Sequence, residues 1–144
     1  MNAQFDLDFG DPSHGGIFFV TSDDLDPLAD AAGMQGLSVC RVSLTEYTDR
    51  EALFDRLSKA LRLPVDFGRN WDALADSVRD LSWLKAPGYI LLFDRAESMR
   101  DTSEDDFDNL LDILEEAVDY WQEAGSPFFV FLALPESAFD DTDD

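Results

Sequence analysis

The sequence predicts an α/β fold, with a small and mainly parallel sheet of three to four strands packed against about four to five helices. Short apolar runs alternate with helical patterns along the chain. Two of these runs, residues 89–93 and 128–133, are almost wholly apolar, as expected of strands covered on both faces. The chain has 144 residues, 45% of them hydrophobic, which fits one domain with a substantial core.

The first strand and helix are predicted close to the start of the chain. An apolar run at residues 17–21 forms the strand, and residues 23–33 follow with helical spacing. Ser22 can cap the start of this helix through its side chain, and Gly33 is a suitable stop.

The second strand is predicted at residues 39–44, where apolar and polar side chains alternate. Cys40 lies on its apolar side, and we expect it to be a small buried residue. A T-x-x-E capping box, Thr48 to Glu51, starts the next helix, and Pro64 ends it.

The second half of the chain repeats the alternation. A short helix is predicted at about 70–81, a strand at 89–93, a long helix at about 103–124 and a last strand at 128–133. Gly125 is a natural end for the long helix.

The charge of the chain is strongly negative. Its 32 acidic and 10 basic residues give a net charge of −22. Nucleic-acid binding is not expected, because phosphate contacts need Lys and Arg. A basic protein is the natural complement, although plain solubility or a salt-adapted host would also account for the composition.

The expected location follows from the lack of a recognisable targeting or membrane-spanning segment in the sequence. No segment resembles a secretory signal or a membrane-spanning helix, so we expect no membrane association. The single cysteine cannot form an intrachain disulfide, and the cytoplasm is the expected compartment.

The helix at 70–81 separates into two faces on a helical wheel. Asp72, Asp76 and Asp80 form one acidic stripe. Like charges four residues apart repel, and Asp is a poor residue inside a helix, so the stripe is locally unfavourable. It indicates either a binding surface or an ordinary solvated face. The opposite face is apolar and should pack on the sheet; its residues are Trp71, Leu74, Val78 and Leu81.

The loop before this helix has its own signals. Gly68 suggests a turn with positive φ or a close approach of the backbone, and Asn70 can cap the helix. The loop and the helix together would form a compact acidic knob.

The same segment resembles the barstar family of ribonuclease inhibitors. Residues 63–84 read LPVDFGRNWDALADSVRDLSWL and fit the pattern L-P-x-x-[FY]-G-x-N-x-D-A-L-x-D. The order of elements from about residue 39 to 133 is also similar to that family. The resemblance implies a non-enzymatic inhibitor of immunity or antitoxin type, which blocks the active site of a basic ribonuclease or nuclease-type toxin and is a monomer when free.

The resemblance also implies a domain organisation. We expect a barstar-like domain at 16–134, in which 16–36 is an added strand–helix unit and 37–134 is the family core. Residues 1–15 are expected to be a disordered or loosely docked acidic arm, and 135–144 an acidic flexible tail.

Binding residues are carried over position by position. Asp76 matches the principal carboxylate of the family and Asp72 the second one, whereas Asp80 is added from the helical wheel alone. The family has a Tyr where this chain has Asp66 and a Trp where it has Ala75. The expected partner-binding residues are Asp66, Phe67, Gly68, Asn70, Trp71, Asp72, Ala75, Asp76 and Asp80. On the last helix, Asp119, Tyr120 and Glu123 lie near a further contact position of the family.

Three other functions compete with inhibition. Catalysis has little to use, because His14 is the only histidine and Cys40 lies in a predicted strand. Calcium binding would need a ligand loop that is missing, and the acids at 104–112 fit the start of a helix. We therefore expect no metal or cofactor. An acidic interaction module whose partner is not a ribonuclease stays open.

Overall fold

The computed structural model describes residues 8–139, and its centre is a parallel sheet of four strands. The strands are β1 (Gly16–Val20), β2 (Ser38–Ser43), β3 (Tyr89–Asp94) and β4 (Phe128–Ala133), in the spatial order β1-β4-β3-β2. All three neighbouring pairs are parallel. The predicted fold class is confirmed.

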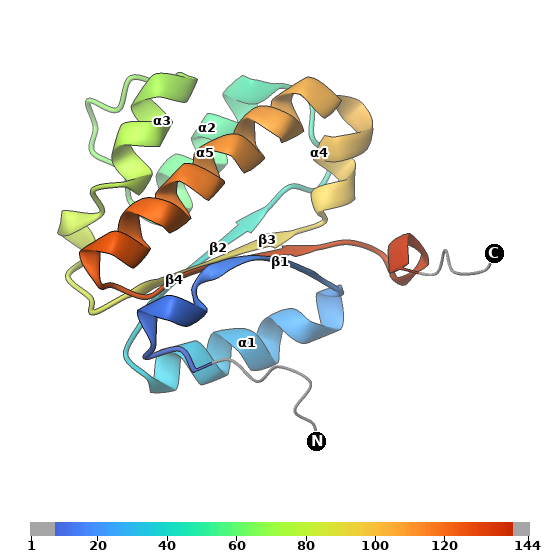
Figure 1. Ribbon diagram of the computed structural model, residues 1–144. Coiled ribbons are helices and arrows are strands. Elements are labelled where there is room, and N and C mark those ends of the chain that lie inside the picture. The colour runs from blue at the N-terminus through green and yellow to red at the C-terminus, as the bar shows by residue number, and fades with distance from the viewer. Residues whose placement is uncertain (1–7, 140–144) are drawn as a thin grey trace.

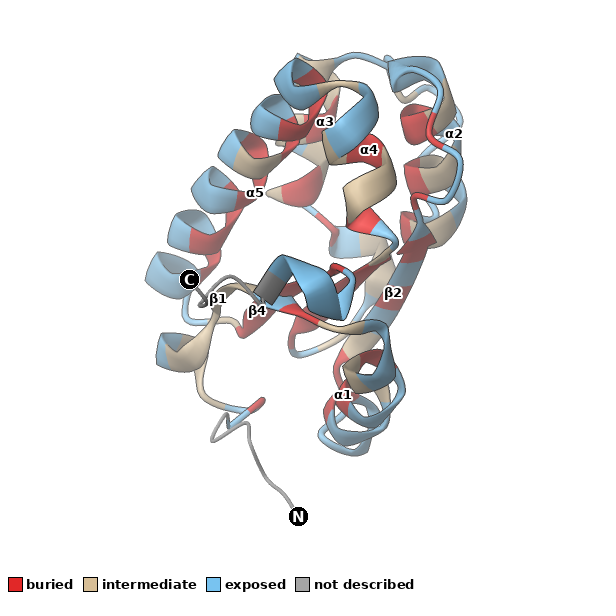
Figure 2. Ribbon diagram, turned by 90° about the vertical axis from the view of Figure 1, so that its right-hand side faces the viewer, coloured by how far each residue is buried: buried red, intermediate tan, exposed pale blue. Residues whose placement is uncertain are grey.

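The helices cover both faces of this sheet (Figure 1). Helix α1 (Ser22–Met34) lies alone on one face. The other face carries the remaining helices, which are α2 (Arg50–Leu61), α3 (Trp71–Val78), α4 (Ala96–Thr102) and α5 (Glu104–Ala124). Figure 2 shows that the buried sides of α1 and α5 are turned towards the sheet and their exposed sides towards solvent.

The core therefore consists of two layers separated by the sheet. Ile90 and Leu92 of β3 point towards α1, while Leu91 and Phe93 point towards the other helices. Every residue of β4 is buried. The strands predicted to be covered on both faces are the two central strands, which explains their wholly apolar sequences.

The helix starts differ from the predictions by about one residue. Thr21, not Ser22, caps α1, because the Asp24 carboxylate accepts hydrogen bonds from the Thr21 N–H and hydroxyl at 3.2 Å. Asp49, not Thr48, caps α2 by accepting from the Ala52 N–H at 3.0 Å. Several neighbouring residues can cap each helix, and the folded backbone decides which of them does so.

The helix ends show the same kind of difference. Helix α1 passes Gly33 and ends at Met34, and Gly36 takes the left-handed conformation with φ 86°. Helix α2 ends at Leu61, three residues before Pro64, because Arg62 is left-handed. Gly125 ends α5 as predicted, with φ 80°.

The predicted long helix is preceded by a helix that was not predicted. Helix α4 occupies residues 96–102, and Ser103 then caps α5 by accepting from the Asp106 N–H at 3.3 Å. Arg95 at φ 57° lets the chain turn directly from β3 into α4.

Part of the predicted N-terminal arm packs against the sheet. Phe9 is buried, and its ring lies edge-on to Phe129 at 4.8 Å between centroids. The Gln122 side-chain amide donates to the Ser13 and Gly15 carbonyls at 3.4 and 3.3 Å. Residues 8–15 are thus docked, whereas residues 1–7 lie outside the described part of the chain.

The end of the chain contains a short 3-10 helix at Glu136–Phe139. The rest of the predicted acidic tail, residues 140–144, lies outside the described residues. Within residues 8–139, no helix is long and apolar enough to cross a membrane.

Candidate binding surface

The loop from α2 to α3 is shaped by backbone turns. After the left-handed Arg62, the Phe67 N–H donates to the Pro64 carbonyl at 2.9 Å and closes a turn. Arg69 takes a second left-handed conformation, with φ 56°, just before the helix. The two turns bring a short loop to the start of α3.

Gly68 lies in a crowded part of this loop. A Cβ atom at this position would lie 3.2 Å from the Ala73 Cβ and 3.3 Å from the Asn70 Nδ2. Of the two reasons predicted for a glycine here, close approach is therefore confirmed, and the positive φ belongs to Arg69 instead.

Asn70 caps α3, as the sequence predicts. Its Oδ1 accepts from the Ala73 N–H at 2.7 Å, and its Nδ2 donates to the Gly68 carbonyl at 3.3 Å. One side chain thus joins the loop to the first turn of the helix.

Two aromatic residues fix the loop and the helix start to α2. The rings of Phe67 and Trp71 pack edge-on against Phe54, with centroids 6.0 and 5.2 Å away. The Trp71 indole nitrogen is buried and has no hydrogen-bond partner among residues 8–139. Both side chains are half-buried, so they support the loop and the helix start from the side of the core. Direct contact of either side chain with a partner stays a prediction.

Helix α3 has the two faces that its sequence predicts. Leu74 and Val78 are buried, and Asp72 and Asp76 are exposed. The apolar face packs mainly against α5 and not, as predicted, on the sheet, because α5 lies between α3 and the strands. The Asp76 side chain is 79% exposed. These two carboxylates can therefore be reached by a partner without any movement of the fold.

Asp80 does not lie on this helix. Helix α3 ends at Val78, Leu81 is buried in the left-handed conformation, and the Asp80 carboxylate accepts from the Ser82 N–H at 3.3 Å. The prediction that the helix reaches residue 81 is wrong. The acidic stripe on α3 consists of Asp72 and Asp76, and Asp80 is exposed in the turn that follows.

Two arginines beside the stripe were not anticipated. Arg69 pairs with Asp55 of α2 at 2.8 Å and holds the loop to that helix. Arg79 pairs with Asp76 at 2.9 Å and also donates from Nε to the Ala75 carbonyl at 3.1 Å. The three-residue spacing of Asp76 and Arg79 is that of a helical ion pair and could have revealed this contact.

The positions that depart from the family pattern lie at the border of the surface. Asp66 is exposed in the loop, next to the fully exposed Val65. Ala75 is half-buried and packs against the core.

The last helix borders the end of α3. The Trp121 indole N–H donates to the Val78 carbonyl at 2.8 Å, and the Tyr120 ring packs edge-on against Trp121. Tyr120 is 47% exposed, and Asp119 and Glu123 are exposed as well. These residues stay candidates for an extension of the surface.

The residues considered for catalysis do not come together. His14 accepts a hydrogen bond from the Asp8 N–H at 2.9 Å near the start of the described chain. Cys40 is buried in β2 as predicted, and burial raises the pKa of its thiol, which makes it a weak nucleophile.

The acids considered for calcium do not converge either. Asp106 points inwards and accepts from the Tyr47 hydroxyl at 2.8 Å. Within residues 8–139, no three His, Cys, Asp or Glu side chains are grouped so that they could hold a metal ion.

Comparison with solved structures gives a likeness in fold alone. The structure of the Aeropyrum pernix ORC2 protein, in its ADPNP–ADP complexes, is similar with a TM-score of 0.58 at 15% sequence identity. The likeness covers 88% of this chain but only 37% of that protein. Among curated proteins, no sequence matches this chain.

A family model gives the closer relationship. The model described as barstar (barnase inhibitor) matches residues 37–133, which include β2 to β4 and all four helices on one face of the sheet. The match spans about two thirds of the chain and contains both the α2–α3 loop and α3. The chain therefore belongs to the barstar family.

Proposed function

We propose that the protein inhibits a basic ribonuclease, by placing α3 and the preceding loop in the active site of that enzyme. The observation that carries the proposal is the pair of exposed carboxylates, Asp72 and Asp76, on a helix fixed by its cap and by two aromatic anchors. Membership of a family of ribonuclease inhibitors supports the same assignment.

The physical basis is imitation of substrate charge. A ribonuclease collects positive potential in its site in order to hold phosphate groups. A row of fixed carboxylates offers that charge without a bond that the enzyme can cleave. Opposite net charges speed the encounter at low salt, and pairing with exclusion of water slows dissociation. The protein acts as a ligand in this account and performs no chemistry of its own.

Rigidity supports such a role. Ordering a flexible acidic segment on binding would cost free energy, whereas this surface is ordered before it meets a partner. The Asn70 cap, the Arg69–Asp55 ion pair and the two aromatic anchors provide that order. The single buried thiol suits a reducing compartment, and we place the protein in the cytoplasm.

A partner that is not a ribonuclease is the second candidate. It is favoured by Ala75, a small and half-buried residue where the family has an aromatic one. Large aromatic side chains often dominate interfaces, so their loss changes which protein fits.

Nucleotide binding is not carried over from the structural neighbour. The first two turns of α1, directly after β1, carry Asp23, Asp24 and Asp26, and no Gly-rich loop with a lysine joins the two elements. Three carboxylates at this place would repel a phosphate chain.

A ribonuclease assay tests the proposal. A barnase-type ribonuclease is titrated with the wild-type protein, and RNA cleavage is followed at several RNA concentrations. We expect inhibition that is competitive with RNA, and Asp30→Ala on α1 should inhibit like the wild type while Asp76→Ala is weaker. Binding without loss of RNA cleavage would favour the interaction module instead.

A further inference from the structure

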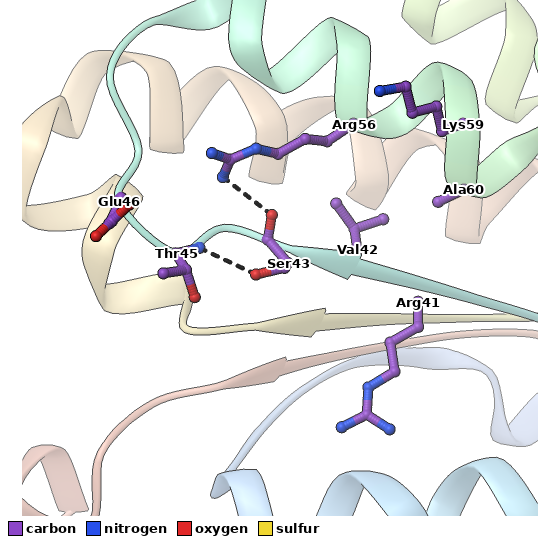
Figure 3. A pocket seen from close by; sticks show the side chains of 8 residues that line it. All are labelled: Arg41, Val42, Ser43, Thr45, Glu46, Arg56, Lys59 and Ala60. Carbon is purple, nitrogen blue, oxygen red and sulfur yellow. Dashed lines mark hydrogen bonds between the residues drawn. The ribbon is translucent and has the colours of Figure 1, made fainter.

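A second surface lies between α2 and the outer edge of β2, where side chains of both elements line a hollow (Figure 3). A hollow of about 550 Å³ follows this edge. It shares no residue with the candidate surface at 66–80, so a role for this hollow does not rest on the proposed function. Its lining residues are Arg41, Val42, Ser43, Thr45, Glu46, Arg56, Lys59 and Ala60.

The backbone of β2 has unused hydrogen-bonding groups at this edge. In the described part of the chain, β2 pairs only with β3. The N–H groups of Ser38 and Leu44 donate to carbonyl groups on the β3 side of the strand, at 3.0 and 2.8 Å. The backbone N–H and C=O groups of the even-numbered residues of β2 therefore point towards β3. Because N–H and C=O groups alternate between the two sides of a parallel strand, the odd-numbered residues present theirs outwards. These residues are Val39, Arg41 and Ser43.

One outward group already has a partner. The Arg56 Nη1 donates to the Ser43 carbonyl at 3.0 Å, as drawn in Figure 3. This bond fixes the guanidinium beside the strand. Within residues 8–139, the outward backbone groups of Val39 and Arg41 have no partner strand, so they are available to an added one.

The cations beside the edge differ from most cations of this protein. Six arginines of the described part pair with a carboxylate, as expected when acids outnumber bases by 32 to 10. Arg56 and Lys59 have no such partner within residues 8–139, although both line the hollow. One carboxylate, that of Glu46, also lines the hollow, but Arg56 and Lys59 outnumber it, so positive charge is available to an acidic ligand.

We propose that the open edge of β2 binds an extended acidic segment of a partner protein, which adds to the sheet as a fifth strand. The outward N–H and C=O groups would pair with its backbone, and carboxylates would meet Arg56 and Lys59. The hollow is open along the strand, whereas small-molecule sites enclose most of their ligand. A peptide strand fits this shape better than a small anion.

The geometry also sets the pattern of the segment. Side chains of a strand alternate between its two faces, so only every second one would face α2 with Arg56 and Lys59. On the other face, Arg41 already pairs with Asp26 at short range and with Asp94 at 3.8 Å. The preferred segment thus has acids at alternate positions, with neutral residues between them.

Binding of synthetic peptides tests this proposal. A fluorescent peptide of about eight residues, with Asp or Glu at alternate positions and Thr or Val between, is titrated with the full chain and followed by anisotropy. A second peptide of the same sequence carries N-methyl groups on alternate amides, which blocks strand pairing but keeps the charges. We expect binding of the first peptide, with amide shifts at Val39 and Arg41 in NMR spectra, and no binding of the second.

Two charge variants complete the experiment. Lys59→Gln should lower the affinity for the peptide about three- to fivefold. Lys85→Gln removes the same charge outside the hollow and should leave the affinity unchanged. Equal binding of both peptides, equal effects of both variants, full displacement of the peptide by inorganic phosphate, or no binding would each overturn the proposal. The last outcome would assign Arg56 and Lys59 to protecting the strand edge from aggregation.

Discussion

Asp76 is both the expected principal contact and the partner of an intramolecular cation. In the free protein its carboxylate pairs with Arg79 at 2.9 Å, and both side chains are substantially exposed. A basic partner must compete with Arg79 for this carboxylate. The ion pair with Arg79 therefore adds an energetic cost to binding through Asp76. The neighbouring Asp72 carries no such cost, because no ion pair of its carboxylate is found among residues 8–139.

Arg79→Gln is predicted to strengthen binding to the ribonuclease. Exposed ion pairs contribute up to about 1 kcal/mol, so the gain in affinity is expected to reach at most about fivefold. Arg95→Gln makes the same charge change at the Glu97 pair and serves as the control in a titration by calorimetry. Equal gains from both variants would mean that net charge, and not release of Asp76, is responsible.

At the scale of elements, one buried polar contact connects the β2–α2 loop to α5. The Tyr47 hydroxyl donates to Asp106 at 2.8 Å, and Arg50 lies 3.9 Å from the same carboxylate. The Tyr47 N–H donates to Ser98 of α4 at 2.9 Å. Because α5 also holds the end of α3 through Trp121, this contact helps to fix the layer that carries the candidate surface.

Tyr47→Phe is predicted to lower the free energy of unfolding at neutral pH by about 1–2 kcal/mol. The change leaves a buried carboxylate without its hydroxyl donor. Urea denaturation of both proteins measures the difference. A loss below a few tenths of a kcal/mol would show that water or Arg50 replaces the donor at no cost.

The same variant should change the stability at alkaline pH. Burial first, and then the hydrogen bond to Asp106, raise the pKa of Tyr47 above its ordinary value of 10.0. The folded protein therefore keeps this proton where the unfolded chain loses it, so the stability falls as the pH rises above about 10. Tyr47→Phe should show a shallower alkaline loss, with a remainder from Tyr89, whose pKa is raised by burial. Equal slopes for both proteins would contradict this assignment.

The elements also show what a single sequence can and cannot predict. The apolar runs at β3 and β4 could be recognised because burial on both faces makes them continuous. The long helix could be recognised because burial of one side gives its apolar stripe a helical period. Helix α4 was missed because it has seven residues and only Ala96 and Met99 buried, too few to establish a period. The end of α3 was missed because Leu81 stays buried after the helix stops, so the apolar period continues where the helix does not.

The candidate site was predictable to a similar degree. The Asn70 cap and the exposure of Asp72 and Asp76 follow from local pattern. The Arg69–Asp55 pair joins residues 14 positions apart and depends on how α2 and the loop pack, which no local pattern encodes.

At the scale of the whole molecule, β1 and α1 precede the region that the family model matches. Strand β1 pairs with β4, and α1 buries Leu25, Leu28 and Ala32 against the second face of the sheet. We propose that this unit folds together with the family core as one domain.

Removal of residues 1–36 is predicted to give an insoluble or unfolded chain. The truncation would uncover apolar side chains of β3 and β4, among them Ile90, Phe129 and Phe131, and open the edge of β4. Leu25→Ala in the full chain is a milder test and should cost about 2–4 kcal/mol in urea denaturation. A soluble truncated protein with a cooperative unfolding transition would show that the core folds alone.

We propose that Asp76 on α3 makes the decisive contact with a basic ribonuclease. Calorimetric titration of a barnase-type ribonuclease with the wild type, Asp76→Ala and the control Asp30→Ala tests it most directly. We predict that Asp76→Ala loses about 2 kcal/mol or more of binding free energy with nearly unchanged thermal stability, while Asp30→Ala binds like the wild type. Tight binding that is equally strong for Asp76→Ala would contradict the assignment of the surface, and no binding by the wild type would contradict the assignment of the partner.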